Sequence, residues 1–265
     1  MPEVVYRMMT LLCALVGTRP IGTNLGLVHL LWMLVSGRLL ASRGALFPGL
    51  LDCGLSARAI RRAWMALGQG GWTSAQLLRR WAAIIAQEGR WQPHTHGGYQ
   101  PVAVDVTGFW RPRLRACPTT HYHQGAGQAL PAIPVGIIAR VGRVGTQRLA
   151  LPLAFVRADP TDPAPSTHAR LLVAEAVRQG QADDVLVLDA GFGLALLHAA
   201  GATRYVVRLA KNATCRRATP PAYGGRGRPP TRGTSVRPLP RTYRGRDVPA
   251  TPPDRVETWR EDDLL

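Results

Sequence analysis

Hydrophobic residues recur every three or four positions through most of the first 95 residues, which is the spacing of an α-helix. The first predicted helix covers Leu25–Ala41 and is followed by a turn at Pro48-Gly49. A second helix starts after Ser56 and a third at Thr73-Ser74, because Ser and Thr are good N-cap residues. The pattern therefore predicts a helical region over residues 1–95.

The second predicted helix separates apolar from basic residues. Its apolar face holds Ile60, Ala63, Trp64 and Leu67, and the opposite face holds Arg58, Arg61 and Arg62. A short helix, a glycine-containing turn at residues 53–56 and an arginine-bearing second helix resemble a helix-turn-helix DNA reader. A plain helical bundle gives the same pattern, so both interpretations stay open.

After Tyr99 the pattern changes to shorter apolar segments rich in Val, Ile and Leu, which is typical of β-strands. Three strands are expected, the last two joined by a hairpin turn at Gly142–Gly145, over residues 101–109, 130–141 and 147–159. The elements expected next are a helix over 165–180 with Ser166 or Thr167 as its N-cap, a buried strand from Asp184, a helix over Leu194–Ala200 and a strand over 204–211. This order predicts an α/β fold with a mixed sheet over residues 96–215.

The chain is strongly basic, with 33 Lys and Arg residues against 16 Asp and Glu, a net charge of +17 and a pI of about 11.3. Residues 216–265 are dense in Pro, Gly and Arg, and no carboxylate lies between Asp189 and Asp247. Such a segment cannot build a core, so we expect a basic, largely irregular tail or insertion that contacts DNA phosphates, with a disordered linker as the alternative. The residues expected to contact DNA are Arg58, Arg61, Arg62, Arg208, Lys211, Arg216, Arg217, Arg226, Arg228 and Arg232.

The cysteines and the apolar stretches argue against several classes of protein. The four cysteines are far apart and form no C-x-x-C pair, which argues against a zinc ribbon and favours reduced thiols in a cytosol. The most apolar stretch, Leu25–Val35, is shorter than the roughly 20 residues that a membrane span needs. We therefore expect no membrane partner.

Two aspartates stand where an α/β sheet presents ligands. Asp105 lies within the first predicted strand, and Asp189 ends the strand VLVLD. If the two strands are neighbours, the carboxylates converge, and a carboxylate on a buried strand is costly unless it is paired or binds a cation. The pair therefore predicts a Mg²⁺ or Mn²⁺ site. His121 and His123 have no acid or cysteine nearby and are interpreted as loop residues.

Three motifs resemble, in this order, those of insertion-sequence transposases of the DDE type: VAVDVTGFWRP, VLVLDAGFG and RLAKNATCRRATPPAYGGRGRPPTRG. The resemblance runs from about Leu25 to Trp259. It implies a ribonuclease-H-like catalytic core in which two Asp and a downstream Glu hold two divalent metals for phosphodiester cleavage and strand transfer. Asp105 and Asp189 match the first two acids. The implied partners are transposon ends, target DNA and a second copy of the chain, in the bacterial cytoplasm at the nucleoid.

The third acid is the point where the chain departs from the family pattern. Glu257 and Glu261 are the only late glutamates, and they lack the Tyr- and Arg-rich helical context of the family's Glu. We therefore expect a C-terminally truncated transposase. Two alternatives stay open: a non-catalytic DNA-binding remnant that represses transposition, and a metal-dependent nuclease or resolvase on the same fold.

Overall fold

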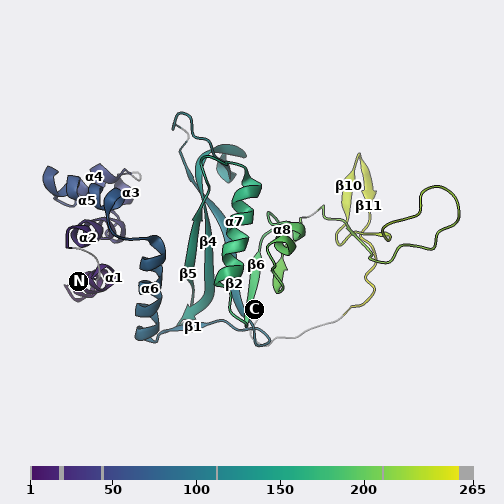
Figure 1. Cartoon of the computed structure of the whole chain (residues 1–265), viewed down its shortest axis with the longest axis horizontal. Helices are drawn as coiled ribbons and strands as arrows, with labels where there is room; N and C mark the ends of the chain where they lie inside the picture. The colour runs from purple at the N-terminus through teal and green to yellow at the C-terminus, as the bar shows by residue number, and fades with distance from the viewer. Residues whose placement is uncertain (1, 18–20, 43–44, 112, 211, 257–265) are drawn as a thin grey trace. The chain divides into compact units, whose positions relative to one another are not determined.

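The computed structural model describes residues 2–17, 21–42, 45–111, 113–210 and 212–256 (Figure 1). The chain divides into two compact units, Met1–Val206 and Val207–Leu265. The first unit contains the predicted helical region and most of the predicted sheet, and the second contains the predicted basic tail.

Helices form the N-terminal part of the first unit. They are α1 (Pro2–Val16), α2 (Ile21–Val35), α3 (Arg38–Ala41), α4 (Leu46–Asp52), α5 (Ala57–Gln69) and α6 (Ser74–Glu88). A small apolar core joins α1, α2, α4 and α5 and consists of Val16, Leu27, Leu30, Met33, Leu50, Ile60 and Ala63. The helical character predicted for this region is confirmed, and α1 lies ahead of the first helix that was predicted.

Both N-caps predicted within the helical region are present. The Ser56 hydroxyl accepts a hydrogen bond from the Ala59 N–H at 3.3 Å, and Thr73 forms a capping box with Gln76 at the start of α6. Trp64 was expected on the apolar face of α5, but its side chain is 46% exposed. The apolar face of α5 is therefore narrower than predicted.

The helical region differs from the prediction between α2 and α4. The single helix expected over Leu25–Ala41 is broken after α2, because Gly37 adopts a left-handed backbone with φ 73°. The turn expected at Pro48-Gly49 lies inside α4. Pro48 is tolerated in the first helical turn, where its missing N–H has no partner to lose, and a side chain at Gly49 would collide with Met33 Sδ.

A mixed sheet forms the rest of the first unit. Its strands are β1 (Trp91–Pro93), β2 (Gln100–Trp110), β3 (Thr120–His123), β4 (Gln128–Val144), β5 (Gln147–Arg157), β6 (Asp184–Leu188) and β7 (Tyr205–Val207). The strand order is β1-β4-β2-β6-β7, and β3 and β5 also pair with β4. β4 runs antiparallel to β2 and β5, whereas β6 runs parallel to β2. The predicted α/β class, with helices and a mixed sheet, is confirmed.

α7 (Pro165–Gln179) covers one face of the sheet, and α8 (Leu194–Ala199) follows β6 (Figure 1). Leu172 of α7 packs so closely on Gly136 of β4 that a Cβ there would lie 2.5 Å from Leu172 Cδ2. Ile138 lies two residues further along β4 than Gly136 and therefore on the same face. Val104 of β2 is the register partner of Ile138, so it lies on this face as well. Both side chains are buried. Strand alternation therefore places Asp105 on the opposite face.

Two local features of the sheet region differ from the prediction. The hairpin turn is Gly145-Thr146, because β4 continues through Val144 and Gly145 supplies the left-handed φ of 59°. Neither Ser166 nor Thr167 caps α7, whose N-cap is Ala164, without a side-chain cap. Pro165 occupies the first helical position, and its restricted backbone favours the start of α7 there without a capping side chain.

The second unit contains two short strand pairs. β8 (Cys215–Arg216) pairs with β9 (Ser235–Val236), and β10 (Arg241–Tyr243) pairs with β11 (Arg246–Val248), both antiparallel. Among the described residues of this unit, only Gly233 is buried. The unit is therefore held by strand pairing and local hydrogen bonds, as expected for a segment so poor in apolar residues.

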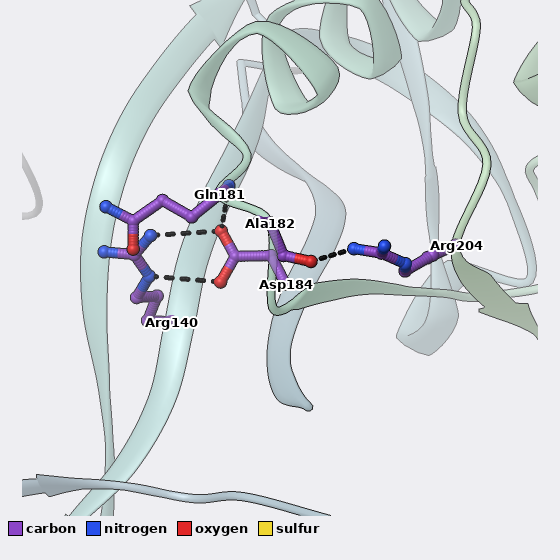
Figure 2. A network of polar contacts seen from close by, with 5 residues as sticks. All are labelled: Arg140, Gln181, Ala182, Asp184 and Arg204. Carbon is purple, nitrogen blue, oxygen red and sulfur yellow. Dashed lines mark hydrogen bonds and ion pairs between the residues drawn. The ribbon is translucent and has the colours of Figure 1, made fainter. Parts of the chain in front are cut away.

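A buried ion pair joins the two strands that flank β2 (Figure 2). Arg140 on β4 donates to both carboxylate oxygens of Asp184, Nε to Oδ1 at 3.4 Å and Nη2 to Oδ2 at 3.0 Å. The Gln181 N–H also donates to Oδ2, at 2.8 Å, and Arg204 donates to the Ala182 carbonyl beside it. The Asp184 side chain is only 3% exposed, so the guanidinium supplies the charge that its burial requires.

Arg140→Ala is expected to lower the free energy of unfolding by about 3 kcal/mol, because it leaves a buried carboxylate without its counter-charge. Urea denaturation followed by circular dichroism measures the change. Arg143→Ala is the matched control: Arg143 is exposed, its guanidinium bonds the Gln92 side chain, and its removal is expected to cost less than about 1 kcal/mol. Equal destabilisation of the two variants would contradict a structural role for the Arg140–Asp184 pair.

Candidate active site

The parallel pairing of β2 with β6 places Asp105 beside Asp189. The register aligns Val104 with Leu188, the last residue of β6; Asp105 follows Val104 on β2, and Asp189 follows Leu188. Neighbouring strands lie about 4.8 Å apart, so two adjacent backbone positions present the two carboxylates. The structure thus brings together the two acids that the sequence singled out, which lie 84 positions apart in the chain because 189 − 105 = 84.

Each carboxylate is oriented by a backbone N–H close to it. Asp105 Oδ1 accepts a hydrogen bond from the Val106 N–H at 2.8 Å, and Asp189 Oδ1 accepts one from the Gly191 N–H at 2.8 Å. Gly191 suits this turn, because a Cβ there would lie 3.0 Å from Asp189 Oδ1. Neither Oδ2 receives a hydrogen bond from another described residue.

The expectation that these carboxylates are buried is wrong. Both aspartates are exposed, because Asp105 lies on the face of the sheet opposite α7 and Asp189 lies just beyond the end of β6. Desolvation therefore does not force them to bind a cation. What supports a cation site is their adjacency, since two carboxylates side by side repel each other unless a positive charge lies between them.

The open face of the sheet around Asp105 also carries aromatic side chains. Ile137 of β4 is the register partner of both Asp105 and Phe155, so the three lie in one row across the strands. Phe109 lies four residues further along β2, on the same face. Phe155 is 43% exposed and Phe109 53%. A large substrate can therefore reach this face.

A cavity of about 220 Å³ lies at the border between this pair and the N-terminal end of α7. Its lining includes Asp105, Asp189, Thr120, His121, His168 and Phe192. The His168 ring is buried, with Nε2 2.8 Å from the Val156 carbonyl oxygen. His168 therefore holds the start of α7 against β5.

The two histidines interpreted as loop residues belong to β3 and pack against Trp110. The ring centroids of His121 and His123 lie 5.8 and 4.8 Å from that of Trp110, whose Nε1 donates to the His121 carbonyl at 3.2 Å. Gly108 allows this packing, since a Cβ there would lie 2.7 Å from the His121 ring. A four-residue strand gives no clear two-residue period, so the sequence pattern could not reveal this packing.

The donor set fits a hard divalent cation of the Mg²⁺ type. Mg²⁺ is commonly held by one or two carboxylates and completes its six-fold coordination with water and substrate phosphates. Asp105 and Asp189 supply two such carboxylates, and in the described part of the chain no third Asp, Glu, His or Cys joins them in a cluster. Glu257 and Glu261, the candidates for a third acid, lie outside the described residues.

The arginines expected to contact DNA fall in both units. Arg58, Arg61 and Arg62 are exposed on α5, as predicted. Arg208, Arg216, Arg226, Arg228 and Arg232 are exposed in the second unit, and Lys211 lies outside the described residues. Arg217 differs from the others, because its guanidinium donates to both Asp254 oxygens at 2.7 and 2.8 Å. These hydrogen bonds and the positive charge of Arg217 lower the pKa of Asp254 below its usual value.

The cysteines are unpaired, and the apolar stretch near the N-terminus is a helix packed in the helical core. Cys13, Cys53, Cys117 and Cys215 are all free thiols. In the part of the chain that the structure describes, no helix has the length and apolar character that crossing a membrane requires. The apolar stretch Leu25–Val35 belongs to α2, and Leu27, Leu30 and Met33 within it are buried in the helical core.

Comparison with known proteins leaves the family of this chain open. No protein-family model matches the sequence, and no curated protein matches it either. Its function is therefore inferred from the arrangement of its own residues.

Proposed function

We propose that this chain is a DNA transposase of the DDE type, in which Asp105 and Asp189 hold Mg²⁺ or Mn²⁺ for phosphodiester cleavage and strand transfer at transposon ends. The observation that carries the proposal is the parallel register of Val104 with Leu188, because it places the two aspartates of the family motifs next to each other. Two carboxylates that are adjacent and exposed suit a reaction on DNA, whose phosphates must reach the cation.

The strand order supports a ribonuclease-H-like core. β4 pairs antiparallel with both β2 and β5, and after α7 the chain returns as β6 on the far side of β2 and parallel to it. The long strands of the sheet therefore run β5-β4-β2-β6, followed by the short β7, with β2 in the centre. The family resemblance implies one acid on the opening strand of such a core and one at the end of VLVLD, and these correspond here to β2 and β6.

In this proposal the two aspartates bind the cation, and backbone N–H groups orient their carboxylates. Asp105 and Asp189 would bind the cation through their oxygens, held in orientation by the Val106 and Gly191 N–H groups. When bound, the cation would stabilise the negative charge that develops on the phosphate during an in-line displacement. The exposed face around Asp105 leaves room for the DNA strand.

The basic residues supply the affinity for DNA in this proposal. Arg58, Arg61 and Arg62 lie on one exposed face of α5, which follows the glycine-containing turn after α4. Arginines on a helix contact phosphates or base edges, and an α-helix fits the major groove. DNA binding at the nucleoid in the cytoplasm and a homodimer at paired transposon ends belong to the same proposal.

A non-catalytic DNA-binding protein that occupies transposon ends is the second candidate, because the exposed arginines serve it equally well. It predicts binding of end DNA without metal-dependent cleavage. A nuclease or resolvase on the same fold predicts cleavage without strand transfer. A strand-transfer assay with supplied end DNA distinguishes these outcomes.

Asp105→Asn and Asp189→Asn are each expected to weaken Mn²⁺ binding at least about tenfold, because each variant removes one of two anionic ligands. Isothermal titration with MnCl₂ measures the affinity, and a plasmid-nicking assay with Mn²⁺ measures cleavage. Asp183→Asn is the matched control, since Asp183 is an exposed aspartate at the other end of β6. Unchanged Mn²⁺ affinity in both site variants would overturn the metal site.

The triple variant Arg58→Ala, Arg61→Ala, Arg62→Ala is expected to bind DNA more weakly and with a flatter salt dependence. The slope of log affinity against log salt should fall by about 0.9 for each DNA phosphate that the variant no longer binds. Fluorescence anisotropy with labelled duplex DNA over a salt series gives the slope. Arg148→Ala, an exposed arginine on β5, is the control. A slope unchanged from the wild type would exclude α5 from the DNA interface.

A further inference from the structure

We propose that the loop between β8 and β9 binds the minor groove of A·T-rich duplex DNA, an inference that rests on the proposed DNA-binding function. The loop covers residues 217–234 and contains the sequence Gly-Gly-Arg-Gly-Arg-Pro-Pro at 224–230. The positive charge of these arginines by itself predicts only contacts with DNA phosphates. The inference specifies in addition the groove that they enter and the kind of DNA sequence that they prefer.

The base of the loop is closed, so its tip is presented as a unit. Beyond the β8–β9 pair, the Arg217 N–H donates to the Thr234 carbonyl at 3.0 Å, and the Gly233 N–H donates to the Arg217 carbonyl at 2.9 Å. A Cβ at Gly233 would lie 2.5 Å from the carbonyl oxygens of both Arg217 and Thr219, so only glycine allows this closure. The residues from 218 to 229 are all exposed.

The loop carries three arginines besides Arg217, and two of them lie at its tip. Arg217, at the base, is neutralised by its bidentate pair with Asp254. Arg226, Arg228 and Arg232 form no ion pair with any described residue. No acidic residue occurs within the loop. The tip therefore presents two guanidinium groups, those of Arg226 and Arg228, to a polyanion, whereas Arg232 lies next to Gly233 at the base.

The shape of the tip decides between the two grooves of DNA. Gly224, Gly225 and Gly227 have no side chain, and Gly225 and Gly227 have positive φ values of 76° and 77°, which other residues rarely adopt. The Tyr223 hydroxyl donates to the Gly227 carbonyl at 2.7 Å and holds the turn between the two arginines. Between residues 224 and 227 the chain carries only one side chain, that of Arg226, so this stretch is nearly as narrow as a bare backbone.

A backbone of this width suits the minor groove, which is about 6 Å across, whereas the major groove accepts a helix or a two-stranded ribbon. The described residues of the loop form neither a helix nor a strand pair at the tip. A·T tracts narrow the minor groove and deepen its negative potential, which attracts arginine in particular. The geometry and the charge therefore agree on A·T-rich DNA.

The test compares two duplexes of equal length, one with a central A·T tract and one with a G·C tract, in anisotropy titrations of the full chain at one salt concentration. We expect the A·T duplex to bind about tenfold more tightly, and netropsin, a minor-groove ligand, to displace the protein from it. Equal affinity for the two duplexes, or no displacement by netropsin, would overturn the inference and leave DNA binding intact. Absence of binding to either duplex would overturn the proposed DNA-binding function as well.

Substitutions separate groove recognition from charge. The double variant Arg226→Lys, Arg228→Lys keeps both charges but replaces arginine with the more strongly hydrated lysine, so the A·T preference should fall toward unity while the salt slope is retained. Arg244→Ala, Arg246→Ala removes two charges from the β10–β11 hairpin and should weaken binding to both duplexes alike. A preference that survives the lysine variant would place minor-groove recognition outside this loop.

Discussion

The position of β2 between β4 and β6 is the constraint on which the candidate site depends. Hydrogen bonds pair β2 antiparallel with β4 on one side and parallel with β6 on the other. Because side chains alternate along a strand, a shift of one residue in either pairing would turn Asp105 toward α7 or separate it from Asp189. Apolar residues on the α7 face oppose such a shift, since Val104, Ile138 and Leu188 would no longer be buried.

The Arg140–Asp184 pair reinforces the register of β6 against β2. β6 has five residues, so its ladder with β2 is short, and the ion pair ties its first residue to β4 across β2. A shift of β6 would leave the buried Asp184 carboxylate without its counter-charge, so the ion pair opposes a change of register. Its effect on the candidate site is indirect: the ion pair holds one end of β6, and Asp189 follows the other.

The molecule uses its two kinds of charge differently. Asp105 lies on β2 and Asp189 directly follows β6, so the backbone of the sheet positions both carboxylates. This suits a reaction that needs two ligands at a set spacing. The arginines lie on an exposed helix face and on a loop whose base is closed but whose tip is solvent-exposed. Attraction between arginines and phosphates is long-ranged and weakly directional, so it does not require side chains held at a fixed spacing. Recognition of the minor groove requires in addition a narrow tip.

The amino-acid sequence by itself determined where several of the longer helices and strands lie, because hydrophobic period and cap residues act locally. Ser56 and Thr73 start their helices as predicted, and the main strands around Asp105, Ile138 and Asp189 lie where the apolar runs are. Short elements such as β1 and β3 were missed, because three or four residues carry too little pattern to identify a strand.

Only the tertiary structure decided which strands are neighbours, which face each aspartate occupies and which charges are paired. The sequence pattern could not show that Asp184 is buried against Arg140, nor that Arg217 is bound to Asp254, because the partners lie 44 and 37 positions apart. It also predicted buried carboxylates where the structure has exposed ones. The reason is that burial depends on what covers a face of the sheet, and in the described residues α7 covers only the face opposite Asp105.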